Sequence, residues 1–119
     1  MNNLTKCLDI KKDIEYSIMR GEYNNNKLPS ITNMMEDYNC SWGTAVKVID
    51  MLEKEGIVTR KQGVGCFLIP HKNVYLINKH KSKSAEELYR TLVEFKDIGI
   101  DKETVDIIYN NAMERLYPS

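Results

Sequence analysis

The sequence predicts a mainly α-helical fold with one small β-hairpin, an α+β arrangement. Several segments place apolar residues three and four positions apart, which is the spacing of one buried helix face. Two short β-type runs flank a pair of glycines, a pattern typical of a hairpin. The chain has 119 residues and a hydrophobic content of 42%, which suits one packed domain with an appendage.

The first helix is predicted from apolar residues near the N-terminus. They are Cys7, Ile10, Ile14 and Ile18. We expect this helix to end at Gly21, because glycine commonly follows the last helical turn. The polar segment 24–27 is then expected to form a loop.

Two further helices are predicted from their capping residues. Pro29 favours an extended entry, and the hydroxyl of Ser30 can accept a free backbone N–H, so a short helix should follow. Ser41 is expected to cap a third helix, which ends at Gly56. The apolar positions of the second helix are Ile31, Met34, Met35 and Tyr38, and those of the third are Ala45, Val48, Ile49 and Leu52.

The predicted hairpin consists of strands at 57–60 and 66–69, joined by the glycine-containing segment 61–65. Residues 71–83 follow, with four lysines, two histidines and no acid, and we interpret them as a basic linker with a possible extended piece at 74–77. The formal net charge of the chain is zero, so charge alone does not indicate a nucleic-acid binder.

The last part of the chain, 84–119, is predicted to form two helices. Ser84 and Glu87 have the spacing of a capping box, and Asp101 is expected to cap the second helix after a break at 98–100. The apolar stripes are Leu88, Leu92 and Phe95 in the first helix and Val105, Ile108, Tyr109, Ala112 and Leu116 in the second. Two short helices cannot cover such stripes well, so they need each other, the first domain or a second copy of the chain.

The order of these elements is that of a winged helix-turn-helix. A third helix of this length can lie in a major groove, and the hairpin tip can approach the adjacent DNA backbone. Glycines at the tip, Gly63 and Gly65, allow the main chain to come close to phosphates.

Specific motifs in this region resemble the GntR family of bacterial transcription regulators. The stretches are KLPSI at 27–31, SWGTA at 41–45, LEKEGIV at 52–58 and RKQGVGCFL at 60–68. The short tail with its IGI-D-x-E phrase is similar to the YtrA subfamily, in which two helices form a dimerisation arm. The resemblance implies a winged helix-turn-helix DNA-binding domain at 1–70, a linker at 71–83 and a dimerisation arm at 84–119.

The resemblance also implies a function: a cytoplasmic repressor that binds a palindromic double-stranded operator as a homodimer through a sequence-specific contact. Several arginines of the family pattern are replaced, since Thr32, Trp42 and Val46 stand at three of their positions. The candidate DNA-binding residues are Lys27, Ser30, Thr32, Ser41, Trp42, Gly43, Thr44, Val46, Lys47, Arg60, Lys61, Gly63 and Gly65. The candidate dimerisation residues are the two stripes named above.

Helical periodicity predicts that one face of the third helix points outward. Its members are Gly43, Thr44, Val46, Lys47 and Asp50. Because this face holds few cations, we expect a dimer with few phosphate contacts and a preference for A·T-rich half-sites. Trp42 has two interpretations: it stacks along a sugar-phosphate strand, or it folds over the second helix.

An alternative function is a winged-helix protein-interaction module with weak or no DNA binding, which the apolar outward face would suit. An enzyme is not expected, because no catalytic grouping or phosphate loop is present. The three cysteines lack metal-ligand spacing, so neither a metal nor a cofactor is expected. No apolar run approaches the roughly 18 residues of a membrane span.

Overall fold

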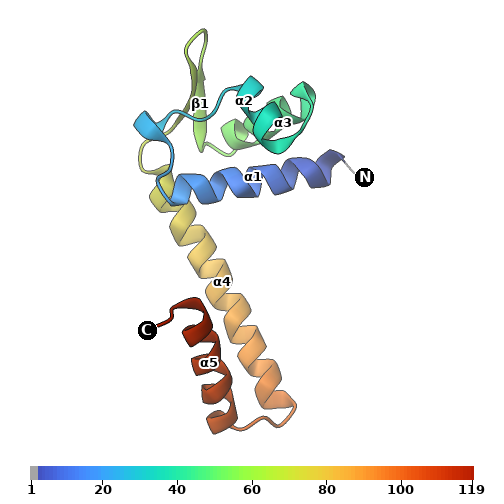
Figure 1. Cartoon of the computed structure of the whole chain (residues 1–119), viewed down its shortest axis with the longest axis vertical. Helices are drawn as coiled ribbons and strands as arrows, with labels where there is room; N and C mark the ends of the chain where they lie inside the picture. Colours follow the sequence, from blue (N-terminus) through green and yellow to red (C-terminus); the bar gives the residue numbers. More distant parts are fainter. Residues whose placement is uncertain (1–2) are drawn as a thin grey trace. The chain divides into compact units, whose positions relative to one another are not determined.

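The computed structural model describes residues 3–119 and divides into two compact units. The first unit ends at Asn78 and the second comprises Lys79–Ser119. The elements in order are α1 (Asn3–Met19), the 3₁₀ turn η1 (Asn24–Asn26), α2 (Ile31–Tyr38), α3 (Trp42–Lys54), β1 (Val58–Lys61), β2 (Gly65–Leu68), α4 (Lys72–Asp97) and α5 (Lys102–Leu116) (Figure 1). The mainly α fold with one hairpin is therefore confirmed.

The core of the first unit lies between α1, α2, α3 and the base of the hairpin. All four predicted apolar residues of α1 and all four of α3 are buried there. The core is completed by Leu28, Met34 of α2, Ile57, Val58 and Leu76. Burying a side chain of this size contributes about 1.5–3 kcal/mol, so the stripes fix how α1 and α3 are rotated about their axes.

Three of the four predicted helix caps are confirmed. The Ser30 Oγ accepts the Asn33 N–H at 3.1 Å, and the Ser41 Oγ accepts the Thr44 N–H at 3.1 Å. Asp101 Oδ1 accepts the Thr104 N–H at 2.8 Å. Hydrogen bonding to the Thr104 side chain, and second to its backbone N–H, lowers the pKa of the Asp101 carboxyl. Each cap satisfies one backbone donor that the first helical turn leaves without a partner.

The hairpin is antiparallel, with Val58 opposite Leu68 and Arg60 opposite Cys66. The segment before α2 lies along the outer edge of β2, where Lys27 pairs with Phe67. The Leu28 N–H donates to the Cys66 carbonyl at 2.9 Å. The wing is therefore held on one side by the chain that enters the helix-turn-helix.

One secondary-structure prediction is wrong: residues 72–83 are helical and belong to α4, which runs without a break from Lys72 to Asp97. Ser84 lies in the middle of this helix and caps nothing. The reason is that the sequence from 72 to 97 contains no proline or glycine, and lysine is a good helix former. Leu76, only 1% exposed, also anchors the first turns of α4 in the core.

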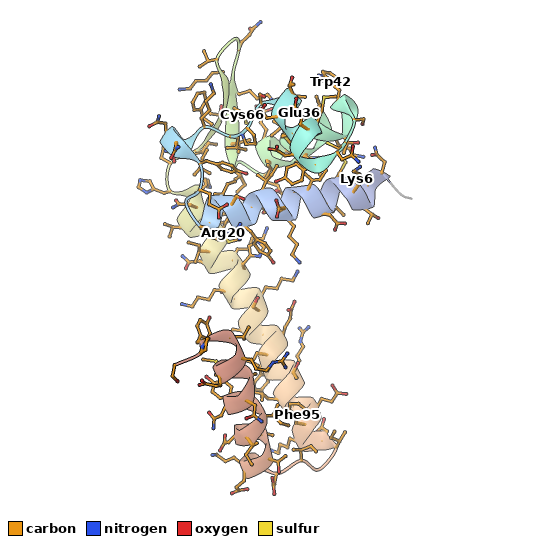
Figure 2. The ribbon with its side chains drawn as sticks, in the orientation of Figure 1. Lys6, Arg20, Glu36, Trp42, Cys66 and Phe95 are labelled. Carbon is orange, nitrogen blue, oxygen red and sulfur yellow. The ribbon has the colours of Figure 1, made fainter. Side chains whose placement is uncertain are left out.

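The second unit is a helical hairpin made of the end of α4 and α5. The turn between them is closed by the Ile100 N–H, which donates to the Phe95 carbonyl at 2.9 Å. Phe95 and Val105 are half-buried, and Phe95 lies between the two helices (Figure 2). No side chain of Lys79–Ser119 is fully buried, so this unit lacks a core of its own. Across residues 3–119, no helix combines the length and the apolar character that crossing a bilayer requires.

Candidate nucleic-acid interface

The face of α3 that points away from the core begins with Trp42 and Gly43 and continues through Lys47 and Asp50, all of which are exposed. Val46 is half-buried. The burial of the opposite stripe sets this orientation, as periodicity predicted. The exposed face thus combines an indole, a glycine backbone, one cation and one carboxylate.

Thr44 is an exception, because the prediction that it points outward is wrong. Thr44 is only 4% exposed. Its hydroxyl oxygen lies 2.9 Å from Ser41 Oγ, and the hydroxyl donates to Asn3 Oδ1 at 2.9 Å. Thr44 therefore ties the start of α3 to the start of α1. Thr44 lies four residues before the buried Val48, so helical periodicity itself places it on the buried face of α3.

The start of α1 is also fastened to the turn between α2 and α3. The ammonium of Lys6 donates to the Asn39 carbonyl at 2.7 Å, at the residue that ends α2 in a left-handed conformation. Figure 2 shows Lys6 on α1 and Trp42 at the start of α3. Sequence reasoning missed Lys6 because its carbonyl partner is 33 residues away in the chain.

Trp42 is 63% exposed, so most of its indole faces solvent. The interpretation in which it folds over α2 is not what the structure has. An exposed indole at the N-terminal end of α3 offers an apolar, flat surface beside free helical N–H groups.

The wing positions its cations through nearby groups. Lys61 Nζ lies 5.0 Å from the centroid of the Phe67 ring, a cation–π contact. Gly65 has φ +141°, and a Cβ built there would lie 3.0 Å from Lys27 Cε. Gly63, at φ +74°, has open space around it. The backbone angle favours glycine at 65, and a side chain there would also shift the flexible end of Lys27.

A groove of about 420 Å³ runs between the wing and the segment that leads into α2. The predicted residues Lys27, Ser30, Arg60, Lys61, Gly63 and Gly65 all line it. The other seven predicted residues lie outside this lining, on or beside α2 and α3: Thr32, Ser41, Trp42, Gly43, Thr44, Val46 and Lys47. The structure therefore brings one half of the predicted set together around a groove that carries three cations.

Cys66 also lines the groove, and burial raises the pKa of its thiol, partly offset by the nearby Arg60 charge. The thiol is therefore neutral at physiological pH and adds no charge to the groove. No cluster of His, Cys, Asp or Glu in residues 3–119 has the arrangement of a metal site.

Arg60 is bound to α3 in two ways. Its guanidinium Nη2 donates to Asp50 Oδ1, and its backbone N–H donates to Glu53 Oε2 at 3.3 Å. Asp50 and Glu53 are three residues apart on α3 and so share a face. Sequence reasoning did not assign Asp50 to the interface, because the pairing joins α3 to β1 and has no local signature.

Comparisons of the sequence with known proteins found two matches that concern the first unit or part of the chain. A family model described as bacterial regulatory proteins, gntR family, matches residues 7–68. An arabinose metabolism transcriptional repressor of Halalkalibacterium halodurans is 41% identical over 64 residues, which are 53% of this chain and 17% of the repressor. The chain therefore spans less than a fifth of the length of that relative.

Solved structures share the fold. A transcriptional regulator from Oenococcus oeni superposes with a TM-score of 0.74 at 18% identity, over 95% of this chain and 92% of that one. BusR of S. agalactiae, solved in complex with its busA-promotor DNA, gives a TM-score of 0.54 at 20% identity, over 92% of this chain and 56% of that one. At these identities the likeness concerns the fold alone.

Proposed function

Because the chain belongs to the GntR family of bacterial regulatory proteins, we propose that it binds a palindromic operator as a homodimer and represses transcription in the cytoplasm. The first 70 residues would form the DNA-binding domain and residues 84–119 the dimerisation arm. Membership of a family of regulators also supports the expectation that the chain is not an enzyme.

The observation that carries this proposal is the pairing of an exposed α3 face with a cationic groove at the wing. Lys47 is exposed on α3, while Lys27, Arg60 and Lys61 line the groove. Cations provide the phosphate contacts on which DNA affinity depends, and an exposed helix supplies contacts to base edges. The exposed Trp42 supports the interpretation in which the indole stacks along a sugar-phosphate strand.

Homodimerisation is supported by the apolar surface of the second unit. Leu88, Leu92, Ile108, Tyr109 and Leu116 are all exposed there, although each is large and apolar. Several large apolar side chains left exposed on one small unit are costly in water and favour an interaction site there. A second copy of the same arm presents a matching surface, and two-fold pairing would place two reading helices on two half-sites.

The repressor role rests on the similarity to the arabinose metabolism transcriptional repressor, which is 41% identical over 64 residues. With few cations per protomer, we expect half-sites in which Val46 and neighbouring small residues contact thymine methyl groups. An A·T-rich inverted repeat is the operator that this surface would favour.

Selection of bound duplexes from a random DNA pool tests the proposal. The purified protein should enrich an inverted repeat whose half-sites are about one helical turn, or a multiple of it, apart. A variant with Arg60→Gln and Lys61→Gln should lose the enrichment while remaining folded by circular dichroism. If the wild-type protein enriches no sequence, the α3 face does not read DNA. The exposed Trp42 would then favour a protein-interaction module instead.

A further inference from the structure

The exposed face of α3 carries a carboxylate, Asp50, at a place where a DNA reader would gain from a cation. Asp50 lies one helical turn after Lys47, and both side chains are exposed. An unpaired acid here would repel phosphate. The structure pairs it with Arg60 of β1, so the guanidinium of the wing lies against the reading helix.

The contact leaves most of the guanidinium available. An arginine has five N–H donors, and one of its terminal nitrogens donates to Asp50 Oδ1. The Arg60 side chain is 40% exposed, so its other donors can reach a ligand. Glu53 holds the backbone N–H of the same residue at 3.3 Å, which fixes where the side chain starts.

We infer that Asp50 is a positioning residue that recruits Arg60 from the wing to the exposed face of α3, where the guanidinium contacts DNA. This inference rests on the proposed DNA-binding function. It supplies the reading helix with an arginine that its own sequence lacks. A planar guanidinium held on one side by a carboxylate can bind phosphate or a guanine edge in a fixed direction.

Positioning should matter on the operator and not on random DNA. On the operator, the base contacts of α3 set the register, so a fixed guanidinium meets its partner without an entropic cost. On random DNA, the register is undefined and only the net charge counts. Removing the carboxylate should therefore weaken operator binding while leaving random binding unchanged or tighter.

The experiment measures binding of the full chain to the selected operator and to a random duplex of equal length by fluorescence anisotropy. Asp50→Asn should weaken operator binding by about 2- to 30-fold for the two pairs of a dimer, given the modest strength of exposed ion pairs. Its affinity for random DNA should stay the same or rise. Asp50→Glu should restore part of the operator preference, and in an Arg60→Gln background Asp50→Asn should have no further effect on that preference.

Asp9→Asn is the matched control, because it removes one exposed carboxylate of the same unit from α1. This control should slightly tighten binding to both DNAs and leave the ratio of the two affinities unchanged. If Asp50→Asn behaves like this control, Asp50 only repels DNA and the inference is overturned. An equal loss of affinity for both DNAs, together with a lower melting temperature of the protein, would assign Asp50 a structural role and would also overturn the inference. A wild-type protein that binds neither DNA would refute the proposed function itself, and with it the inference.

Discussion

Replacing two leucines of the second unit should dissociate the proposed dimer. Leu88 is 53% exposed and Leu92 39% exposed, and they are one helical turn apart on α4. Full burial of a leucine contributes about 1.5–3 kcal/mol. Covering the exposed half of each leucine in the dimer therefore stabilises the dimer by about 1 kcal/mol per side chain. Four such side chains lie in a dimer, and alanine retains a Cβ at each position. Leu88→Ala with Leu92→Ala should therefore cost the dimer about 3 kcal/mol, or roughly a hundredfold in dissociation constant.

Sedimentation equilibrium over a range of concentrations measures this shift. The matched control replaces Leu4 and Leu8, which are 44% and 48% exposed and also one turn apart, on α1 of the first unit. That variant should dimerise like the wild type, because its leucines lie outside the proposed interface. A wild-type chain that stays monomeric at micromolar concentration would refute the reasoning, as would an equal effect of the two double variants.

Three further predictions concern the first unit. Gly65→Ala should lower the free energy of unfolding by about 1–3 kcal/mol, because its φ of +141° disfavours a side chain and the new Cβ would displace Lys27; calorimetry measures the loss. Thr44→Val should lower the free energy of unfolding by about 1 kcal/mol in a denaturant titration, because valine has no hydroxyl to donate to Asn3. An unchanged free energy would mean that water replaces this hydrogen bond at no cost. A chain that ends at Asn78 should remain helical by circular dichroism yet sediment as a monomer, whereas a dimer would place the interface in the first unit.

Sequence reasoning succeeded where the signal is local. The caps at Ser30, Ser41 and Asp101 depend on a hydroxyl or carboxylate three residues before the N–H that it accepts, and all three form as expected. The buried faces of α1 and α3 follow from helical periodicity alone. The two strands begin and end one residue away from the expected limits, which is within the usual uncertainty of element ends, and the pairing of Arg60 with Cys66 is the one those limits imply.

The start of α4 differs from the expected linker because the basic composition of residues 71–83 suggests a linker, whereas their helix propensity favours a helix. The lysines of this segment are good helix formers, and Leu76 is buried as an anchor in the core. Ser84 and Glu87 have capping-box spacing, but the helix is already formed before them. A capping motif predicts a helix start only where no earlier turn extends through it.

The remaining features depend on contacts between distant segments. Thr44 is buried because α1 supplies Asn3 above it, and Arg60 faces α3 because Asp50 and Glu53 hold it there. The i,i+4 relation of Thr44 to Val48 predicts that Thr44 is buried, but no spacing rule within α3 reveals that Asn3 or Arg60 is the partner. The assignment of the other candidate residues to DNA or to a dimer interface remains a prediction.

The salt dependence of DNA binding by a Lys47→Ala variant tests the central claim most directly, namely that the exposed face of α3 contacts DNA. Lys47 is an exposed cation on this face and occurs twice in a dimer. If Lys47 contacts phosphate, the slope of log affinity against log salt concentration should fall in magnitude by about two for the dimer. If Lys47 bonds a base, the base preference should relax at one position per half-site, with a loss of about 1–3 kcal/mol of binding free energy per contact. Lys12→Ala on α1, also exposed, should change neither quantity. Identical binding by wild type and Lys47→Ala, on operator and random DNA at every salt concentration, would contradict the claim.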